Sequence, residues 1–131
     1  DTGTELLGSS SHGSNCAGLI AAETNNEVGI QGVAGGEGAG SKGAQIMVGV
    51  GFGQTSISGF SEAMVYAADM GAAISSNSWS YGIGDFFPQV VKDAIDYGND
   101  NSDIIFVFSA GNSAVDETQY PASYERGVSP A

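Results

Sequence analysis

The chain has 131 residues, of which 41% are hydrophobic, and 15 acidic residues face three basic ones, which gives a formal net charge of −12. This length predicts a single domain over residues 1–131, with enough apolar residues for a folded core. The negative charge repels phosphate groups and anionic lipids, so neither a nucleic-acid-binding role nor a membrane-surface role is expected, whereas hard cations such as Ca²⁺ are favoured.

The spacing of apolar residues predicts helices that alternate with short strands. In chain order, we expect a helix over residues 14–22, strands over 44–50, 72–76 and 104–108, and helices over 56–70 and 85–97 between them. Asp85 is expected to cap the last helix, Gly71 and Gly98 are expected to end the last two helices, and residues 35–43 are expected to form a surface loop. The alternation predicts a three-layer α/β/α fold with a parallel central sheet.

Polar residues directly follow two of the predicted strands. Residues 77–80 (NSWS) follow the second strand, and residues 109–112 (SAGN) follow the third. Ligands of parallel α/β sheets bind at the carboxyl ends of the strands. The sequence therefore predicts a cleft at this edge of the sheet.

Five short blocks resemble conserved motifs of the subtilisin family, in the family's order. They are residues 12–18 (HGSNCAG), 25–34 (NNEVGIQGVA), 76–79 (SNSW, in a kexin-like form), 109–112 (SAGN) and 120–122 (YPA). The resemblance extends from His12 to Ala122. It implies a subtilisin-like α/β domain of which this chain is the central part, and thus an incomplete fold.

The resemblance implies a role for each matching residue. His12 would be the general base of a Ser-His-Asp triad, and Asn112 would donate a hydrogen bond to the oxyanion. The backbone of Ser78, Trp79 and Ser80 would pair with an extended polypeptide substrate. One wall of the pocket for the P1 side chain would be formed by Ser109, Ala110 and Gly111. Read alone, a single histidine is more often structural, and Trp79 could equally be a core aromatic residue.

A calcium loop is also implied by the resemblance. Its oxygen ligands would be the carbonyls of Thr24, Val28 and Ile30 and the side chain of Asn26. An unfilled polar turn remains an equal alternative, and no organic cofactor is expected. Cys16 is the only cysteine, so no internal disulfide can form, and we expect a largely buried thiol behind His12.

The other two triad members are left open by the sequence. Asp1 begins an Asp-Thr-Gly motif like that of the triad acid, but only eleven steps separate it from His12, so an acidic loop is the alternative. Ser129 lies in an echo of the nucleophile motif, with no predicted helix to position it. We expect His12 and Asn112 to share a cleft, because catalysis needs both groups around one carbonyl. Without a positioned nucleophile, we expect the isolated chain to be inactive.

Two function classes follow from this pattern. The first is a secreted or cell-envelope serine endopeptidase, in which the partner of this chain is the remainder of its own catalytic domain. The second is a catalytically dead module that still binds extended peptides.

Overall fold

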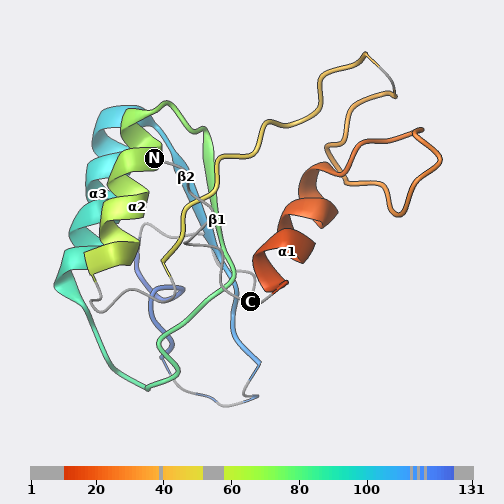
Figure 1. Ribbon diagram of the computed structural model, residues 1–131. Helices are drawn as coiled ribbons and strands as arrows, with labels where there is room; N and C mark the ends of the chain where they lie inside the picture. The colour runs from red at the N-terminus through yellow and green to blue at the C-terminus, as the bar shows by residue number, and fades with distance from the viewer. Residues whose placement is uncertain are drawn as a thin grey trace. The chain divides into compact units, whose positions relative to one another are not determined.

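The computed structural model describes residues 11–38, 40–51, 58–112, 114, 116 and 118–125. Its elements are shown in Figure 1, and their order is α1 (His12–Ala21), α2 (Ser58–Asp69), β1 (Ile74–Asn77), α3 (Gln89–Ser102) and β2 (Ile105–Phe108). The chain divides into two compact units, Asp1–Val48 and Gly49–Ala131, so that α1 lies in the first unit and the other elements lie in the second. Among the described helices, none has the length and apolar character needed to cross a membrane.

The end of α1 is held by backbone hydrogen bonds from residues 32–34. The carbonyl oxygens of Leu19, Ile20 and Ala22 accept bonds from the N–H groups of Val33, Ala34 and Gly32, at 2.9, 2.7 and 2.9 Å. The last carbonyls of a helix have no partner within the helix, and these bonds supply one. The predicted helix over residues 14–22 is thereby confirmed, with a start two residues earlier.

Residues 35–38 and 40–43, the described part of the predicted loop, contain no helix or strand, so the loop is confirmed there, but part of it is tightly packed. Gly35 is buried, and a Cβ at this position would overlap the backbone of Ala22. Gly36 and Gly38 have φ values of 85° and 110°, which favour glycine. The glycines thus allow the loop to lie directly against the backbone that follows α1.

The strand predicted over residues 44–50 is wrong. These residues have no regular secondary structure, and Ile46, Met47 and Val48 are all exposed. A strand requires a neighbouring strand for its backbone hydrogen bonds, and no described segment pairs with residues 44–50. The apolar run over residues 44–50 predicted a buried strand, but an apolar sequence does not by itself provide a neighbouring strand.

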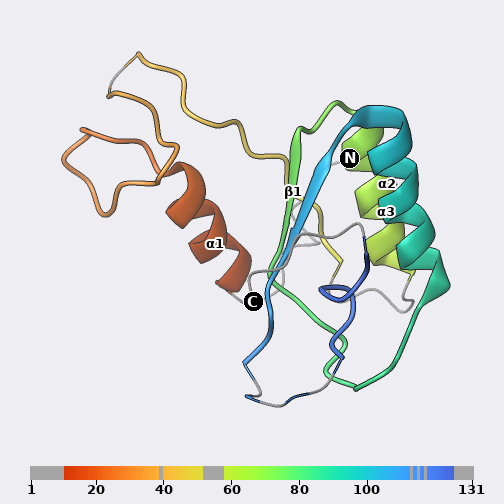
Figure 2. The same cartoon turned by 180° about the vertical axis from the view of Figure 1, so that it is seen from behind.

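The second unit is built on a parallel pair of strands joined by α3. β1 pairs with β2 in the register Ile74↔Ile105 to Asn77↔Phe108. Parallel strands need a crossover, and α3 provides it while packing side by side with α2 on the same face of the sheet, as Figures 1 and 2 show. The incomplete α/β fold with a parallel sheet is confirmed, as are the predicted strands over residues 72–76 and 104–108 with small shifts.

The core of this unit lies between the sheet and the two helices. Its buried apolar residues come from α2, α3, β2 and the segments just before and after β2, and they are Met64, Ala68, Val91, Ala94, Ile95, Ile104, Phe106, Phe108, Ala122 and Tyr124. Within the described part of this unit, no residues cover the opposite face of the sheet, where Ile74 and Ile105 are 63% and 51% exposed. The two strands are therefore covered on one face by the described residues.

Two predicted helix boundaries are corrected by the packing of α3. The helix begins after Pro88 rather than at a cap formed by Asp85, whose φ is 57°. It also passes through Gly98, which is buried against β2, and ends at Asp103 in the left-handed conformation. Gly98 is present because the strand lies too close for a side chain. Gly71, by contrast, follows α2 with a φ of 79°, as predicted.

Candidate active site

The polar segments after β1 and β2 lie next to each other at the carboxyl edge of the sheet. The last register pair is Asn77↔Phe108, and the N–H of Ser109 donates to the carbonyl oxygen of Asn77 at 3.1 Å. The segment after β1 and the segment after β2 therefore begin next to each other, at this hydrogen bond. This confirms that the sheet brings Ser78–Ser80 and Ser109–Asn112 to one edge.

The two segments differ in exposure in a way that suits a binding edge. Ser78, Ala110 and Asn112 are exposed, and Trp79, Ser80 and Ser109 are half-buried. Gly111 is exposed with a φ of 86°, so the chain turns sharply just before Asn112. Asn112 therefore presents its side-chain amide, a neutral hydrogen-bond donor, at the turn that follows the strand.

Trp79 is held by three other aromatic rings. Its indole stacks on Phe60 of α2, with ring centroids 4.1 Å apart and an interplanar angle of 28°. Tyr81 and Phe108 meet it edge-on, with centroids 5.4 and 6.4 Å away. Offset and edge-to-face contacts of this kind stabilise aromatic clusters beyond their buried area. Trp79 is therefore both a packed aromatic residue and part of the segment that lines the edge.

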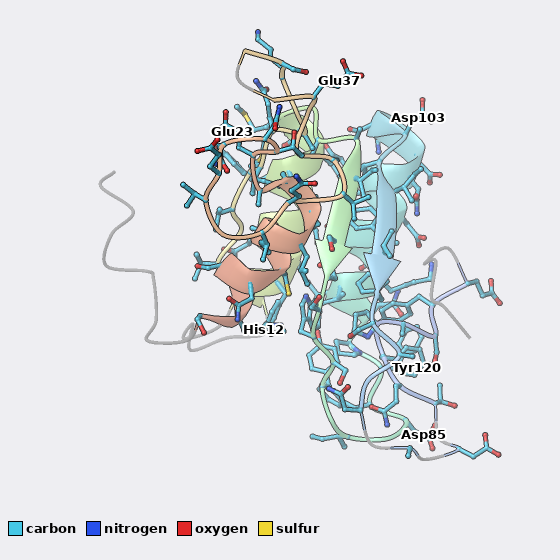
Figure 3. All side chains as sticks on the ribbon, turned by 90° about the vertical axis from the view of Figure 1, so that its right-hand side faces the viewer. His12, Glu23, Glu37, Asp85, Asp103 and Tyr120 are labelled. Carbon is cyan, nitrogen blue, oxygen red and sulfur yellow. The ribbon has the colours of Figure 1, made fainter. Side chains whose placement is uncertain are left out.

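The Tyr-Pro-Ala block packs against the same region. The carbonyl oxygen of Tyr120 accepts a bond from the N–H of Tyr81 at 3.3 Å, and the Tyr120–Pro121 peptide bond is cis. Figure 3 shows Tyr120 below β2, on the segment that follows it. The hydroxyl of Tyr124, which is buried, donates to the carbonyl oxygen of Pro88 at 2.9 Å and so ties this segment to the start of α3. Burial raises the pKa of Tyr81 to about 12.

His12 is the first residue of α1, where its exposed side chain is labelled in Figure 3. Its Nε2 atom lies 3.8 Å from the Sγ atom of Cys16, one helical turn further along. The expected proximity of the thiol to His12 is confirmed. The expected burial is only half right, because Cys16 is half-buried and α1 has no buried residue.

The expected calcium loop is a turn rich in oxygen atoms. The Oδ1 atom of Asn26 accepts a bond from the N–H of Val28 at 3.0 Å, and the hydroxyl of Thr24 donates to the carbonyl oxygen of Gly36 at 2.6 Å. Asn26 Oδ1 keeps a second lone pair, and the other expected ligands are carbonyl oxygens, so the donor set fits a hard cation. Over the described ranges, no three His, Cys, Asp or Glu side chains gather at a possible metal site.

Several expectations stay predictions. Asp1 and Ser129 lie outside the described residues. His12 belongs to the first unit and Asn112 to the second, so their shared cleft stays a prediction as well.

Residues 1–129 match the sequence profile of the Subtilase family. The chain belongs to the subtilase family. The match includes the block around His12, both segments at the sheet edge and the Tyr-Pro-Ala block. The resemblance inferred from the five motifs is thus confirmed for nearly the whole chain.

Three curated proteins are similar to this subtilase. They are fervidolysin of Fervidobacterium pennivorans (33% identical), a thermophilic serine proteinase of Bacillus sp. strain AK1 (32%) and thermitase of Thermoactinomyces vulgaris (31%). The alignments cover 93%, 89% and 92% of this chain, respectively. They cover only 17%, 27% and 40% of the respective relatives, so this subtilase chain spans less than half the length of each.

One residue at the site was missed by the sequence-based predictions. Asn77 was counted only as part of a polar cluster, yet it is 9% exposed and hydrogen-bonded to both strands and to Trp79. The available signal was an amide directly after a predicted strand, because an amide that is buried there must find several partners.

Proposed function

We propose that this chain supplies the general base and the oxyanion donor of a serine endopeptidase that cleaves extended polypeptides. The observation that carries the proposal is the Ser109–Asn77 backbone bond of 3.1 Å, which starts the two edge segments from one point beside Asn112. An acyl-transfer site needs a surface for the peptide next to a donor for the oxyanion. Membership of the subtilase family supports the reaction class.

In the proposed reaction, His12 handles the proton. A ring nitrogen of His12 takes the proton of a serine hydroxyl while the serine oxygen bonds to the carbonyl carbon of the substrate. The side-chain N–H of Asn112 donates to the resulting oxyanion, and the exposed turn after Gly111 keeps this amide accessible. When the C–N bond breaks, His12 returns its proton to the leaving amine, and water then hydrolyses the acyl-enzyme by the reverse roles.

The substrate would bind along the edge segments. Ser78, Trp79 and Ser80 follow a strand, so their backbone can add an extended peptide as a further strand. The opposing wall is Ser109 to Gly111, whose small side chains leave room for the P1 residue. The acid and the nucleophile, for which Asp1 and Ser129 are the candidates within the sequence, complete the triad in the whole protein.

The direct test measures kcat and KM of the whole protein on a chromogenic peptide for His12→Ala and Asn112→Ala. Replacing His12 should abolish turnover, and losing an oxyanion donor should lower kcat by about 10²–10³ with little change in KM. Asn101→Ala is the matched control, since Asn101 is an exposed amide on α3. Turnover that survives His12→Ala would remove the proposed base, and peptide binding without any hydrolysis would make the chain a binding module.

The isolated chain is expected to be inactive on the same peptide, because His12 activates nothing unless a hydroxyl is held within about 3 Å. A fluorophosphonate probe checks this on material of verified mass. Labelling of the isolated chain at Ser129 that depends on His12 would contradict the expectation.

We place the whole protein outside the cytoplasm, as a secreted or cell-envelope enzyme. Fractionation of producing cells, with an antibody to detect the protein, tests that placement.

We also propose that the loop from Thr24 to Ile30 binds one Ca²⁺ through oxygen atoms alone. The side-chain oxygen of Asn26 would be the anchor, since it is the only side-chain ligand of the set. Bound cation stabilises a fold by mass action, so Ca²⁺ should raise the melting temperature and EGTA should reverse the rise. Asn26→Ala should abolish this response, and Asn101→Ala should keep it. An identical Ca²⁺ response in Asn26→Ala would exclude this loop.

A further inference from the structure

Asn77 has an unusual position for an amide. Among the described residues, the buried polar side chains are Ser61 and Asn77, and Asn77 is 9% exposed at the last position of β1. A buried amide without partners is strongly destabilising, so its bonds define what it does. Its Nδ2 atom donates to the carbonyl oxygen and the hydroxyl of Ser75, at 3.0 and 2.9 Å, and reaches the carbonyl oxygen of Val107 at 3.4 Å.

The remaining partner is the indole of Trp79. Trp79 Nε1 donates to the Oδ1 atom of Asn77 at 3.2 Å. An indole N–H can only donate and a backbone carbonyl can only accept, so these partners fix which end of the amide faces each of them. The amide therefore has one orientation that satisfies β1, β2 and Trp79 together, and aspartate or leucine cannot reproduce it.

The aromatic contacts of Trp79 need this hydrogen bond to define a single pose. Phe60 covers one face of the indole, and Tyr81 and Phe108 meet it edge-on. Contacts of this kind restrain the plane of a ring, but a half-turn about the Cβ–Cγ bond of tryptophan keeps nearly the same plane while it moves the N–H group to the other side. The bond to Asn77 adds a direction for the N–H group. Trp79 is half-buried.

We propose that Asn77 is a positioning residue for peptide binding, acting through Trp79 and through the link between β1 and β2. It fixes the indole that flanks Ser78 and Ser80, and its backbone carbonyl anchors Ser109 on the opposite segment. The two walls of the peptide-binding edge therefore keep their spacing through one residue that need not touch the substrate. This inference rests on the proposed function, whose substrate site it deepens.

The test uses Asn77→Leu, which keeps the approximate size of the side chain and removes its hydrogen bonds. The matched control is Ser61→Ala, since Ser61 is also buried but bonds only locally to the carbonyl oxygen of Ser58 in α2. Trp79 is the only tryptophan, so its fluorescence reports the indole without labelling. Asn77→Leu should shift the emission and increase acrylamide quenching, whereas Ser61→Ala should leave both unchanged.

Kinetics of the whole protein separate positioning from general stability. Asn77→Leu should raise KM for an extended peptide about tenfold, the scale of one lost buried hydrogen bond, while kcat for a short ester stays near wild type. Trp79→Phe keeps an aromatic ring but removes the N–H donor together with one of the two fused rings, so it should raise the same KM even if Asn77→Leu fails to fold. Unchanged KM in Trp79→Phe, or an equal rise in Ser61→Ala, would overturn the proposal.

Direct binding distinguishes this failure from that of the proposed function. If the whole protein hydrolyses nothing, fluorescence polarisation still measures the affinity of a labelled extended peptide for the edge segments. Weaker binding in Asn77→Leu than in Ser61→Ala would then support the positioning role without peptidase activity. Equal binding in the two variants would refute it.

Discussion

Gly98 of α3 lies directly against Phe106 of β2, so closely that a Cβ built on Gly98 would come within 2.8 Å of the phenyl ring. The same Cβ would lie 2.7 Å from the Cγ2 atom of Ile104. Both neighbours are 1% exposed and have no space into which to move. The absence of a side chain at Gly98 thus sets the distance between the helix layer and the sheet.

Gly98→Ala should therefore destabilise the second unit. Overpacking a core costs about 1–3 kcal/mol, which outweighs the gain of up to about 1 kcal/mol for alanine in a helix. Urea unfolding followed by Trp79 fluorescence measures the difference. Gly13→Ala is the control, because Gly13 is also helical and a Cβ there would meet nothing within 4 Å. Equal or greater stability of Gly98→Ala would contradict the close packing.

Ile104 and Ile105 test which face of the sheet is covered. They are neighbours of the same type, but Ile104 is 1% exposed and Ile105 is 51% exposed. In the 131-residue chain, Ile104→Ala should lower the free energy of unfolding by about 2–5 kcal/mol, and Ile105→Ala should lower it much less. Similar losses for the two variants would show that the outer face is buried as well.

Tyr124→Phe should lower stability by about 1 kcal/mol, because it removes the hydrogen bond from the hydroxyl to the carbonyl oxygen of Pro88, which keeps only the longer bonds from the N–H groups of Val91 and Lys92. Tyr66→Phe is the control, since Tyr66 is 59% exposed on α2. Thermal melts of both variants under one condition make the comparison. If the two variants melt alike, the Tyr124 hydroxyl does not secure the start of α3.

The alkaline stability of the chain should depend on Tyr81. Burial raises its pKa from 10.0 to about 12, so the folded chain binds this proton more tightly than the unfolded chain. The resulting stabilisation is complete below about pH 10 and is lost as the pH rises towards about 12. Tyr81→Phe should reduce this alkaline loss, while Tyr124, whose pKa burial also raises, keeps part of it.

Tyr81→Phe should also be tolerated at neutral pH. Its hydroxyl is buried and has no hydrogen-bond partner among the described residues, so removing it leaves no partner unsatisfied. Urea midpoints at about pH 8 and about pH 11 test both expectations. A Tyr81→Phe variant that is much less stable than the wild type at the lower pH would indicate that the hydroxyl has a hydrogen-bond partner.

The sequence predicted those elements whose pattern is local. The spacing of apolar residues predicted α2, because one covered face of a helix imposes it, and the unbroken apolar run at residues 104–108 predicted β2. The segment over residues 44–50 has an equally apolar run but no partner strand among the described residues. Strand formation depends on such a partner, which no local pattern reveals.

The same distinction explains the predictions for individual residues. Glycine is typical of a helix end, but the role of Gly98 depends on its close approach to Phe106 of the next strand, which only the packing of α3 on the sheet reveals. Asn77 was likewise placed in the right cluster by the sequence. Its hydrogen bonds to Val107 and Trp79 depend on the strand register and on a side-chain rotamer, neither of which a single sequence specifies.

The backbone bonds between α1 and residues 32–34 make the intervening segment a closed Ω-shaped loop. The N–H of Gly32 meets the carbonyl oxygen of Ala22 at 2.9 Å, so both ends of the loop are fixed at the same point. Changes of length inside the loop should therefore leave the end of α1 in place. This segment is accordingly a replaceable cassette, into which a tag or a different ion-binding sequence could be grafted without moving the helix that carries His12.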